Sequence, residues 1–460
     1  MSQALSLRIP ADDEGLPAKP ARTSTPVLLR RLSILVAVAA GMLALVGTAA
    51  VVLTRNTVDS VGHRTVPAII DSQKIHQALA DADRSAANDF LSGGVEVGGP
   101  RQQYQRDIGL VTSELEQAAE HNSVGSEGSA VLQRVSAKVT EYTGLVETAR
   151  AYNRVGYPVG ATYLRTASRL MHDPKTGILV DIDALDRLNN QNLGRENGQM
   201  WVAGGALAGF YVVALGLLAV LMYTQGFLRA RFRRRRNPRV IAATALLILL
   251  AGGLTVQAAV TYLNVEQAQL QAFGRLHVLW QARSLAVDAN GNESLSLISR
   301  GAGTAFDDAF KAEAKQLVDR PLTDAMIESA ASGEVNFNGL LADELRGASF
   351  PGERDAAVKA LRAYQQFLQI DQAVRNKSAT DREGAVTLAL GSGPGQLGAA
   401  FADMDTWLGQ AIRIVQDHYD AAIATAGPSL ALDAGIPLCA IVIAVLVFWG
   451  LSPRRAEYRA

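Results

Sequence analysis

Cysteine is almost absent from this chain of 460 residues, which contains one, Cys439. A single cysteine cannot form a disulfide within the chain, so every folded domain must be held by packing alone, and cysteine usage does not identify the redox compartment. Histidine is also scarce, and the six histidines show no HxxxH or HExxH spacing. Because zinc sites need such ligands at fixed spacings, we expect no metal site and no cofactor.

Charged side chains are missing from four long apolar stretches. Residues 32–54 are uncharged for 23 positions and residues 434–453 for 20, and residues 197–228 and 240–265 are uncharged as well. About 20 apolar residues cross a bilayer core as a helix, so these stretches predict four transmembrane helices. A cleaved signal peptide is the alternative for the first stretch, but its length and the preceding 31-residue tail favour an uncleaved anchor.

The four stretches also contain no histidine, which disfavours a transporter, because ion-coupled transporters usually place ionisable residues at mid-membrane. They divide the chain into alternating membrane, outside and inside segments. The predicted segments are a disordered cytoplasmic tail (1–31), a first span (32–54), a first outside helical bundle (55–200), a second span (201–223), an arginine-rich cytoplasmic loop (224–239), a third span (240–263), a second outside bundle (264–433), a fourth span (434–453) and a cytoplasmic tail (454–460).

Charge is distributed unequally between these segments. The two tails and the loop hold 15 Lys and Arg against 4 Asp and Glu, whereas the two long segments hold 29 against 40. Positive-inside bias therefore predicts a multi-pass protein of the cell membrane with both termini in the cytoplasm. The inside segments are too short for a catalytic domain, so we expect no enzyme activity and a separate signalling protein on the inside.

The outside segments show helical periodicity and no strand-like alternation. In the first, apolar or small residues recur at positions 75, 79, 82, 86 and 90, which is the spacing of a helix in a bundle. A domain that leaves and re-enters the membrane needs an even number of helices, so each segment is expected to form a four-helix bundle. Glycine and proline clusters place the helices near 55–92, 101–120, 126–154 and 159–198, then 264–300, 304–331, 352–377 and 383–432, with a loop or short inserted element at 332–351.

The two outside segments share a sequence pattern. A shift of 207 residues matches Asp81 to Asp288 and Ser92 to Ser299, and Asp181 with Asp183 recurs later as Asp403 with Asp405. We interpret this as an internal duplication of a span–bundle–span unit. Pro67 lies within the first long helix and is expected to kink it, either as a hinge or without a functional role.

Motifs that would carry chemistry lack their context. Residues 393–398 satisfy GxGxxG, yet no strand precedes them, so dinucleotide binding is not expected. The two aspartate pairs are spaced by two residues, which points them about 200° apart on a helix, and we interpret them as solvated faces. No GxSxG signature is present, and no nucleic-acid partner is expected.

Two groups of residues are candidate partner contacts. The arginine-rich loop exceeds what orientation requires, although topology and attraction to anionic lipids could account for it. We predict that it binds a cytoplasmic partner. The turns of the first bundle farthest from the membrane carry apolar side chains beside an arginine, which either cap the core or bind an outside partner. The residues concerned are Arg231, Arg233, Arg234, Arg235 and Arg236 inside, and Val95, Val97, Arg154, Val155 and Tyr157 outside.

The layout resembles chemoreceptor-type four-helix-bundle sensors, but without their cytoplasmic signalling coiled coil. It is also similar to the actinobacterial GlnX-type four-pass membrane proteins, in the number of spans, the two outside helical domains and the stretch ATYLRTASRLM at residues 161–171. That resemblance implies an outside amino-acid-binding lipoprotein, for glutamine or an acidic amino acid, and a soluble Ser/Thr kinase inside as partners.

We therefore expect a non-enzymatic transmembrane signal transducer that senses such a binding protein and relays its state inward. The alternative is a structural or accessory protein of the envelope or of a transporter, with rigid bundles. Gly205 and Gly209 form a GxxxG motif in the second span that permits close helix packing, within the four spans or in a homo-oligomer.

Overall fold

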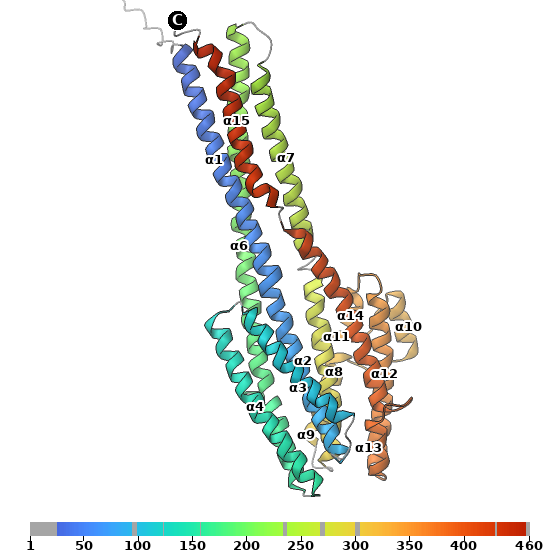
Figure 1. Ribbon diagram of the computed structural model, residues 1–460. Coiled ribbons are helices and arrows are strands. Elements are labelled where there is room, and N and C mark those ends of the chain that lie inside the picture. The colour runs from blue at the N-terminus through green and yellow to red at the C-terminus, as the bar shows by residue number, and fades with distance from the viewer. Residues whose placement is uncertain are drawn as a thin grey trace, which may run out of the picture. The chain divides into compact units, whose positions relative to one another are not determined.

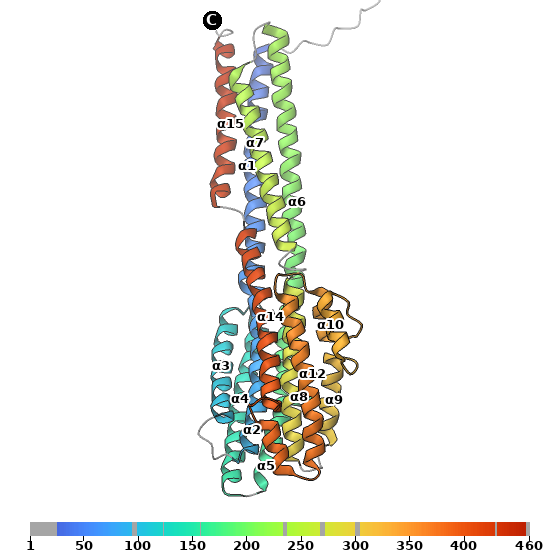
Figure 2. The same ribbon diagram turned by 90° about the vertical axis from the view of Figure 1, so that its right-hand side faces the viewer.

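The computed structural model describes residues 25–93, 99–122, 124–156, 158–232, 237–266, 272–299, 304–427 and 430–456. These residues are almost entirely helical and include no strand (Figures 1 and 2). The chain divides into two compact units. Unit 1 consists of Met1–Thr48, Leu207–Gly253 and Asp433–Ala460, and unit 2 consists of Ala49–Ala206 and Leu254–Leu432.

Four helices are long and apolar enough to cross a membrane, as the charge-free stretches predict. They are α1 (Thr25–Ser60), α6 (Ile178–Phe232), α7 (Pro238–Glu266) and α15 (Leu430–Ala456). Among the described residues, almost all exposed large apolar side chains lie on these helices, including Leu45 and Leu249, each 72% exposed. Such exposure suits contact with lipid, because a soluble domain would bury these side chains.

Within unit 1, a few small or polar residues set the packing of the apolar helices. A Cβ on Gly47 would lie 2.8 Å from Ile436 Cγ2, so this glycine allows α1 and α15 to approach closely. Gln225 Nε2 donates to Thr244 Oγ1 at 2.9 Å between α6 and α7, and Asn237 Nδ2 donates to the Gly450 carbonyl at 2.8 Å. Gly209 of the GxxxG motif faces Val46 within the same unit.

Unit 2 has two halves, defined here as residues 49–206 and 254–432. The first half packs its helices around the side chains predicted from the periodicity, with Ile75, Leu79, Ala82 and Ala86 all buried. It contains the π-helical turn η1 (Val61–Thr65), α2 (Val66–Leu91), α3 (Pro100–Glu120), α4 (Ser126–Arg154), α5 (Val159–His172) and the first part of α6.

The second half forms a comparable helical core around Tyr364, Phe367 and Tyr419, which are all buried. Its helices are α8 (Gly274–Ile298), α9 (Thr304–Leu317), α10 (Asp324–Ser332), α11 (Leu340–Gly347), α12 (Glu353–Ser378), α13 (Arg382–Leu390) and α14 (Leu397–Ala426).

Three predicted helices are broken in the structure. The helix predicted at 159–198 is interrupted between His172 and Ile178, where the Asp173 carboxylate accepts the backbone N–H groups of Lys175 and Thr176 and closes a turn. The helix predicted at 383–432 is interrupted between α13 and α14, and the one at 304–331 between α9 and α10. The inserted element predicted at 332–351 contains one short helix, α11.

The two halves are not separate domains. Helices α2 and α8 lie side by side along their lengths, and we call this contact the seam (Figures 1 and 2). At Gly291 a Cβ would lie 3.6 Å from Arg84 Cα, and Ser294 Oγ lies 2.6 Å from Asn88 Oδ1. Each half keeps an apolar core of its own, but side chains near the seam enter the core of the opposite half, as Ala80 of α2 does in the second half and Leu295 of α8 in the first.

A wide turn precedes α2. The π-helical segment η1 ends just before Pro67, which occupies the first turn of α2, where the missing N–H is least harmful. Glu196 of α6 accepts hydrogen bonds from Ser60 Oγ at 2.6 Å and Thr65 Oγ1 at 2.8 Å, one at each end of the turn. Ala272 and Phe273, just before α8, are π-helical as well. Since no proline follows them, proline is not required for such a turn here.

Candidate functional site

Three exposed apolar side chains cluster at one end of the first half, around the turn between α4 and α5. Outside the candidate spans, the exposed large apolar residues of the described chain are Leu110, Tyr152, Val155 and Val159, and the last three surround this turn. We call this group, with Tyr163, the apolar tip. Tyr152 stacks on Tyr163 with ring centroids 5.5 Å apart, so the tip is a preformed surface of the kind that anchors protein interfaces.

Local hydrogen bonds hold the tip in place. Asn153 Nδ2 donates to the Phe90 carbonyl at 2.8 Å, which fixes the end of α4 to the end of α2. Gly160 sits against α4, where a Cβ would approach the Ala149 carbonyl oxygen to 2.8 Å. The predicted contact Val155 is 63% exposed and Arg154 is exposed beside it. Val155 therefore lies at the surface, whereas Tyr157, the other residue of the core-capping interpretation, lies outside the described residues.

The other predicted contacts cannot be placed. Val95, Val97, Tyr157 and the arginines 233–236 lie outside the described residues, and Arg231 falls at the end of α6. Sequence reasoning missed Tyr152 and Val159, because both occupy regular helical positions. Their exposure at the ends of two adjoining helices was not apparent from periodicity.

A buried carboxylate lies at the centre of the first half. Asp83 of α2 accepts hydrogen bonds from Tyr142 Oη at 3.0 Å and Ser168 Oγ at 2.8 Å, and its Oδ2 lies 3.2 Å from His172 Nε2. Burial disfavours the imidazolium, but the hydrogen bond to Asp83 and nearby carboxylates outweigh it and raise the pKa of His172 to about 9. His172 is therefore protonated at neutral pH.

The group around Asp83 extends to the second half. Asp288 of α8 and Glu313 of α9 are among the carboxylates that raise the pKa of His172. Burial raises the pKa of Glu313 to about 8, with the charge of Asp288 adding to the effect, and Asn292 Nδ2 donates to Glu313 Oε1 at 2.8 Å. A change of charge at His172 would therefore alter the electrostatic energy of acidic side chains in both halves.

A half-buried arginine lies at the centre of a different network in the second half. Arg375 of α12 contacts Asp371 at 2.9 Å, Asp307 at 2.8 Å and Glu293, and its guanidinium lies over the Phe310 ring. Burial, with the charge of Asp371, raises the pKa of Glu293 to about 9. Glu293 is thus protonated at neutral pH, and burial also raises the pKa of Asp371.

Of the two aspartate pairs predicted as solvated faces, Asp403 is exposed as expected, whereas the other three aspartates contact side chains on other helices. Asp181 accepts from Lys138 Nζ at 2.6 Å, and Asp183 lies 3.2 Å from His76 Nδ1. Asp405 accepts two hydrogen bonds from Arg283, at 2.6 and 2.9 Å. Spacing alone could not reveal these partners, since each lies on another helix. These contacts link α6 to α4 and α2, and α14 to α8.

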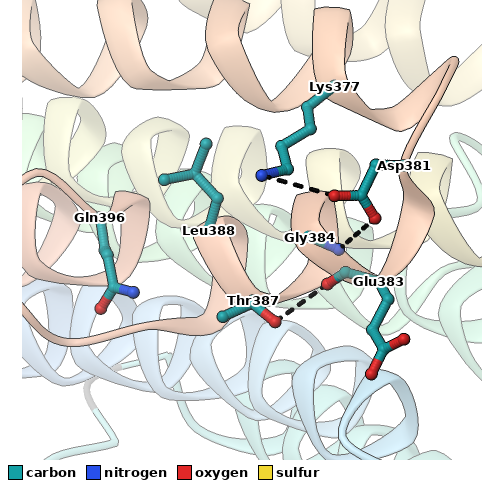
Figure 3. A pocket seen from close by; sticks show the side chains of 7 residues that line it. All are labelled: Lys377, Asp381, Glu383, Gly384, Thr387, Leu388 and Gln396. Atoms are coloured by element: carbon teal, nitrogen blue, oxygen red, sulfur yellow. Dashed lines mark hydrogen bonds and ion pairs between the residues drawn. The ribbon is translucent and has the colours of Figure 1, made fainter.

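Three surface hollows are lined by residues of unit 2. One of about 470 Å³ lies at the α12–α13 turn, where Lys377 and Asp381 form an ion pair at 3.5 Å and the Asp381 carboxylate accepts the Gly384 N–H (Figure 3). Asp381 is thus already paired with Lys377 and caps the N-terminus of α13. We therefore interpret these polar groups as stabilising the turn. A second, of about 570 Å³, lies between α6 and α8 beside Asp186 and His277. The third, of about 250 Å³, opens at the seam.

No group of three or more His, Cys, Asp or Glu side chains in the described residues is arranged to hold a metal ion. Residues 57–198 match the family of actinobacterial sensor domains, which covers most of the first half of unit 2. No curated protein and no solved structure matches the chain. The match supports a sensing or signalling role for a protein with four helices able to span a membrane, and it indicates no catalytic family.

Proposed function

We propose that this protein is a non-enzymatic transmembrane signal transducer whose unit 2 lies outside the cytoplasm and senses an amino-acid-binding protein of the glutamine or aspartate type. The observation that carries the proposal is the sensor-domain match at 57–198, because its two ends lie on α1 and α6, the helices that continue into candidate spans. A change in such a domain can reach the membrane through continuous helices.

The proposed orientation places both termini and the arginine-rich loop in the cytoplasm, on the strength of the basic excess in these segments. It can be tested with single cysteines in a Cys439→Ser background. Ser332→Cys should react with a membrane-impermeant thiol reagent in cells whose outer envelope admits it, and Arg229→Cys should react only after lysis. Labelling of position 229 in intact cells would reverse the orientation.

The apolar tip is the proposed contact for the outside partner. Its exposed tyrosine and valines, beside Arg154, have the composition of interface anchors. Changing Arg154→Glu together with Val155→Asp should weaken capture of the binding protein by at least about tenfold, because a charge then replaces an apolar contact. Leu110→Asp, on an exposed position midway along α3, is the matched control and should bind normally. Equal binding by both variants would remove the tip from the proposal.

On the inside, we propose that Arg231 and the arginines 233–236 bind an acidic surface of a Ser/Thr kinase or another signalling protein, with anionic lipids as competing ligands. Replacing Arg233 to Arg236 by Gln should abolish the inward signal while outside binding persists. The remaining basic residues should preserve the orientation. Normal signalling by this variant would leave the loop with a purely topological role.

We also propose that the halves of unit 2 arose by duplication. The shift of 207 residues that relates the sequences also relates structural features: Thr65, the last residue of η1, corresponds to π-helical Ala272, and Ser92, which follows α2, corresponds to Ser299, which follows α8. Both halves also interrupt their last long helix, at α5–α6 and at α13–α14. Such shared irregularities support common ancestry more than shared apolar positions do.

A further inference from the structure

The third hollow lies where the two halves of unit 2 meet. Its walls come from α2 and α3 of the first half, and from α8 and the α13–α14 turn of the second. A hollow of about 250 Å³ has room for several waters or for a small organic molecule. The hollow is therefore of the size of a free amino acid or a small dicarboxylic acid.

The charge of its lining separates this hollow from the other two. It is lined by Arg84 and Arg106 and by no carboxylate, whereas the hollows beside Lys377 and His277 both contain acidic side chains. Arg84 is held by Asp81, at 2.6 Å, but Arg106 is exposed and donates only to Gln103 Oε1, at 2.6 Å, among the described residues. An arginine without an acidic partner at a concave site favours an anion.

Amide side chains line the same hollow from both halves. Asn290 of α8 is 5% exposed, and its side chain forms no hydrogen bond within the described chain. The small exposed part of Asn290 includes its amide, so the amide is open to a ligand in the hollow. Asn88 of α2 uses its Oδ1 to accept from Ser294, which leaves its N–H₂ group available. These groups would hold the polar end of a ligand whose anion contacts the arginines.

Two helix beginnings contribute to the same place. Gly99 and Pro100 open α3 and Gly398 lies in the first turn of α14, and neither helix has a side-chain cap. Free N–H groups at helix starts favour negative charge. At Gly398 a Cβ would lie 2.7 Å from the Gly391 carbonyl oxygen, so the close packing of this turn requires glycine there.

From these contacts we infer that the seam of unit 2 binds a small organic carboxylate directly, with Arg106 and Arg84 holding the carboxylate and Asn290 and Asn88 the remaining polar groups. Leu390 and Pro100 provide the apolar wall for the carbon chain. Inorganic phosphate is also an anion, but it has neither an additional polar group to bind the amides nor a carbon chain to contact the apolar wall. Because the ligand would touch both halves, its binding stabilises the closed seam over any arrangement in which the halves move apart.

This inference goes beyond the proposed function, since it gives unit 2 a ligand of its own in addition to a protein partner. Its test uses the purified full-length protein in detergent or nanodiscs, without partner proteins, so that its failure and the failure of partner sensing can be told apart. Glutamate, glutamine, aspartate, succinate and inorganic phosphate are titrated separately by calorimetry, with thermal unfolding as a second measurement.

At least one of the four organic probes should bind saturably and raise the unfolding temperature. Arg106→Gln should weaken that binding by about tenfold or more, because one charge-assisted contact is lost at an exposed position that does not support the core. Asn290→Leu should weaken it too. The matched control Arg169→Gln, an exposed arginine on α5 that lines none of the three hollows, should bind as the natural protein does.

Three results would overturn the inference: no saturable binding of any organic probe up to about 10 mM, equal affinity in the natural protein and Arg106→Gln, or binding of phosphate alone. The last result would redefine the site as one for an inorganic anion.

Discussion

In the first half of unit 2 one carboxylate, Asp83, gathers Tyr142, Ser168 and His172, whereas in the second half one guanidinium, Arg375, gathers three carboxylates. The sign of the central charge is opposite, yet the two helical frameworks are alike. A buried charge is tolerated when its hydrogen-bonding capacity is used, whichever sign it has. Similar helical frameworks can thus contain a central residue of either charge.

The two networks also differ in how far they extend. Arg375 and its carboxylates all lie on α8, α9 and α12 of the second half. The Asp83 group is influenced by Asp288 and Glu313 across the seam. The first network therefore links the halves, and the second stabilises one half alone.

The largest expected effect is at the arginine. Arg375→Met should lower the free energy of unfolding by about 3 kcal/mol near neutral pH, because Asp371 and Asp307 then lose the guanidinium that they contact. Thermal unfolding of the full-length protein measures this. Lys311→Met removes an exposed pair at 4.0 Å and should change stability by less than about 1 kcal/mol. If both variants behave alike, Arg375 does not stabilise the second half in the way the structure suggests.

At Asp83 we expect a somewhat smaller loss that depends on pH. Asp83→Ala leaves Tyr142 and Ser168 without an acceptor and should lower stability by about 2 kcal/mol. In the natural protein the raised pKa of His172, about 9, adds stability that is complete below about pH 6.5 and is lost as the pH rises through 9. Asp83→Asn should reduce this loss when unfolding temperatures are recorded from pH 6 to 9.5. An unchanged pH profile in Asp83→Asn would argue against the Asp83–His172 pair.

Asp107 sharpens the comparison, because it is a buried carboxylate that hydrogen-bonds to Ser85 and Gln103 but to no cation. Burial, with the charge of Asp81, raises its pKa to about 7. The stability it contributes is therefore complete below about pH 4 and is lost as the pH rises through 7. The stability change caused by Asp107→Asn should therefore be more favourable at pH 8 than at pH 5, by roughly 2 kcal/mol. A stability increase of the same size at both values would point to packing instead.

The smallest effect is expected at the seam. A Cβ at Gly291 meets Arg84 at an ordinary contact distance of 3.6 Å, so Gly291→Ala should be neutral or stabilising by about 0.5 kcal/mol through helix propensity. At Gly62 the added Cβ would lie 2.4 Å from Ile423 Cγ2, so Gly62→Ala should destabilise. Unfolding temperatures of the two variants should move in opposite directions, and destabilisation by Gly291→Ala would mean the seam is tighter than described.

Sequence reasoning located the four candidate spans, since an apolar stretch of about 20 residues without charge has the length of a helix that crosses a bilayer core. Helical periodicity likewise identified the buried face of α2, with Ile75, Leu79 and Ala82. It missed the breaks before Ile178 and Leu397, although Pro174 and Gly177 precede the first and residues 391–395, rich in glycine and proline, precede the second. The partners of Asp183 and Asp405 were out of reach, since pairing between helices depends on their relative rotation.

Of the candidate contacts, Val155 and Arg154 were identified from their composition at a turn. The hollow at the seam was not, because it requires α2 to pack against α8. Nothing in a one-dimensional pattern relates Arg106 to Asn290, which are far apart in the chain and line the same hollow.

The π-helical turn η1 has a consequence for chain length. A π-helical turn contains one residue more than the α-helical turn that it replaces. Removing exposed His63 should convert η1 to regular helix and leave α1 and α2 in their present rotation. Removing a residue from the middle of α2 would instead turn every later side chain by about 100° and expose the face that carries Ala82 and Ala86. At η1 the chain can therefore lose one residue while the side chains of α2 keep their present orientation.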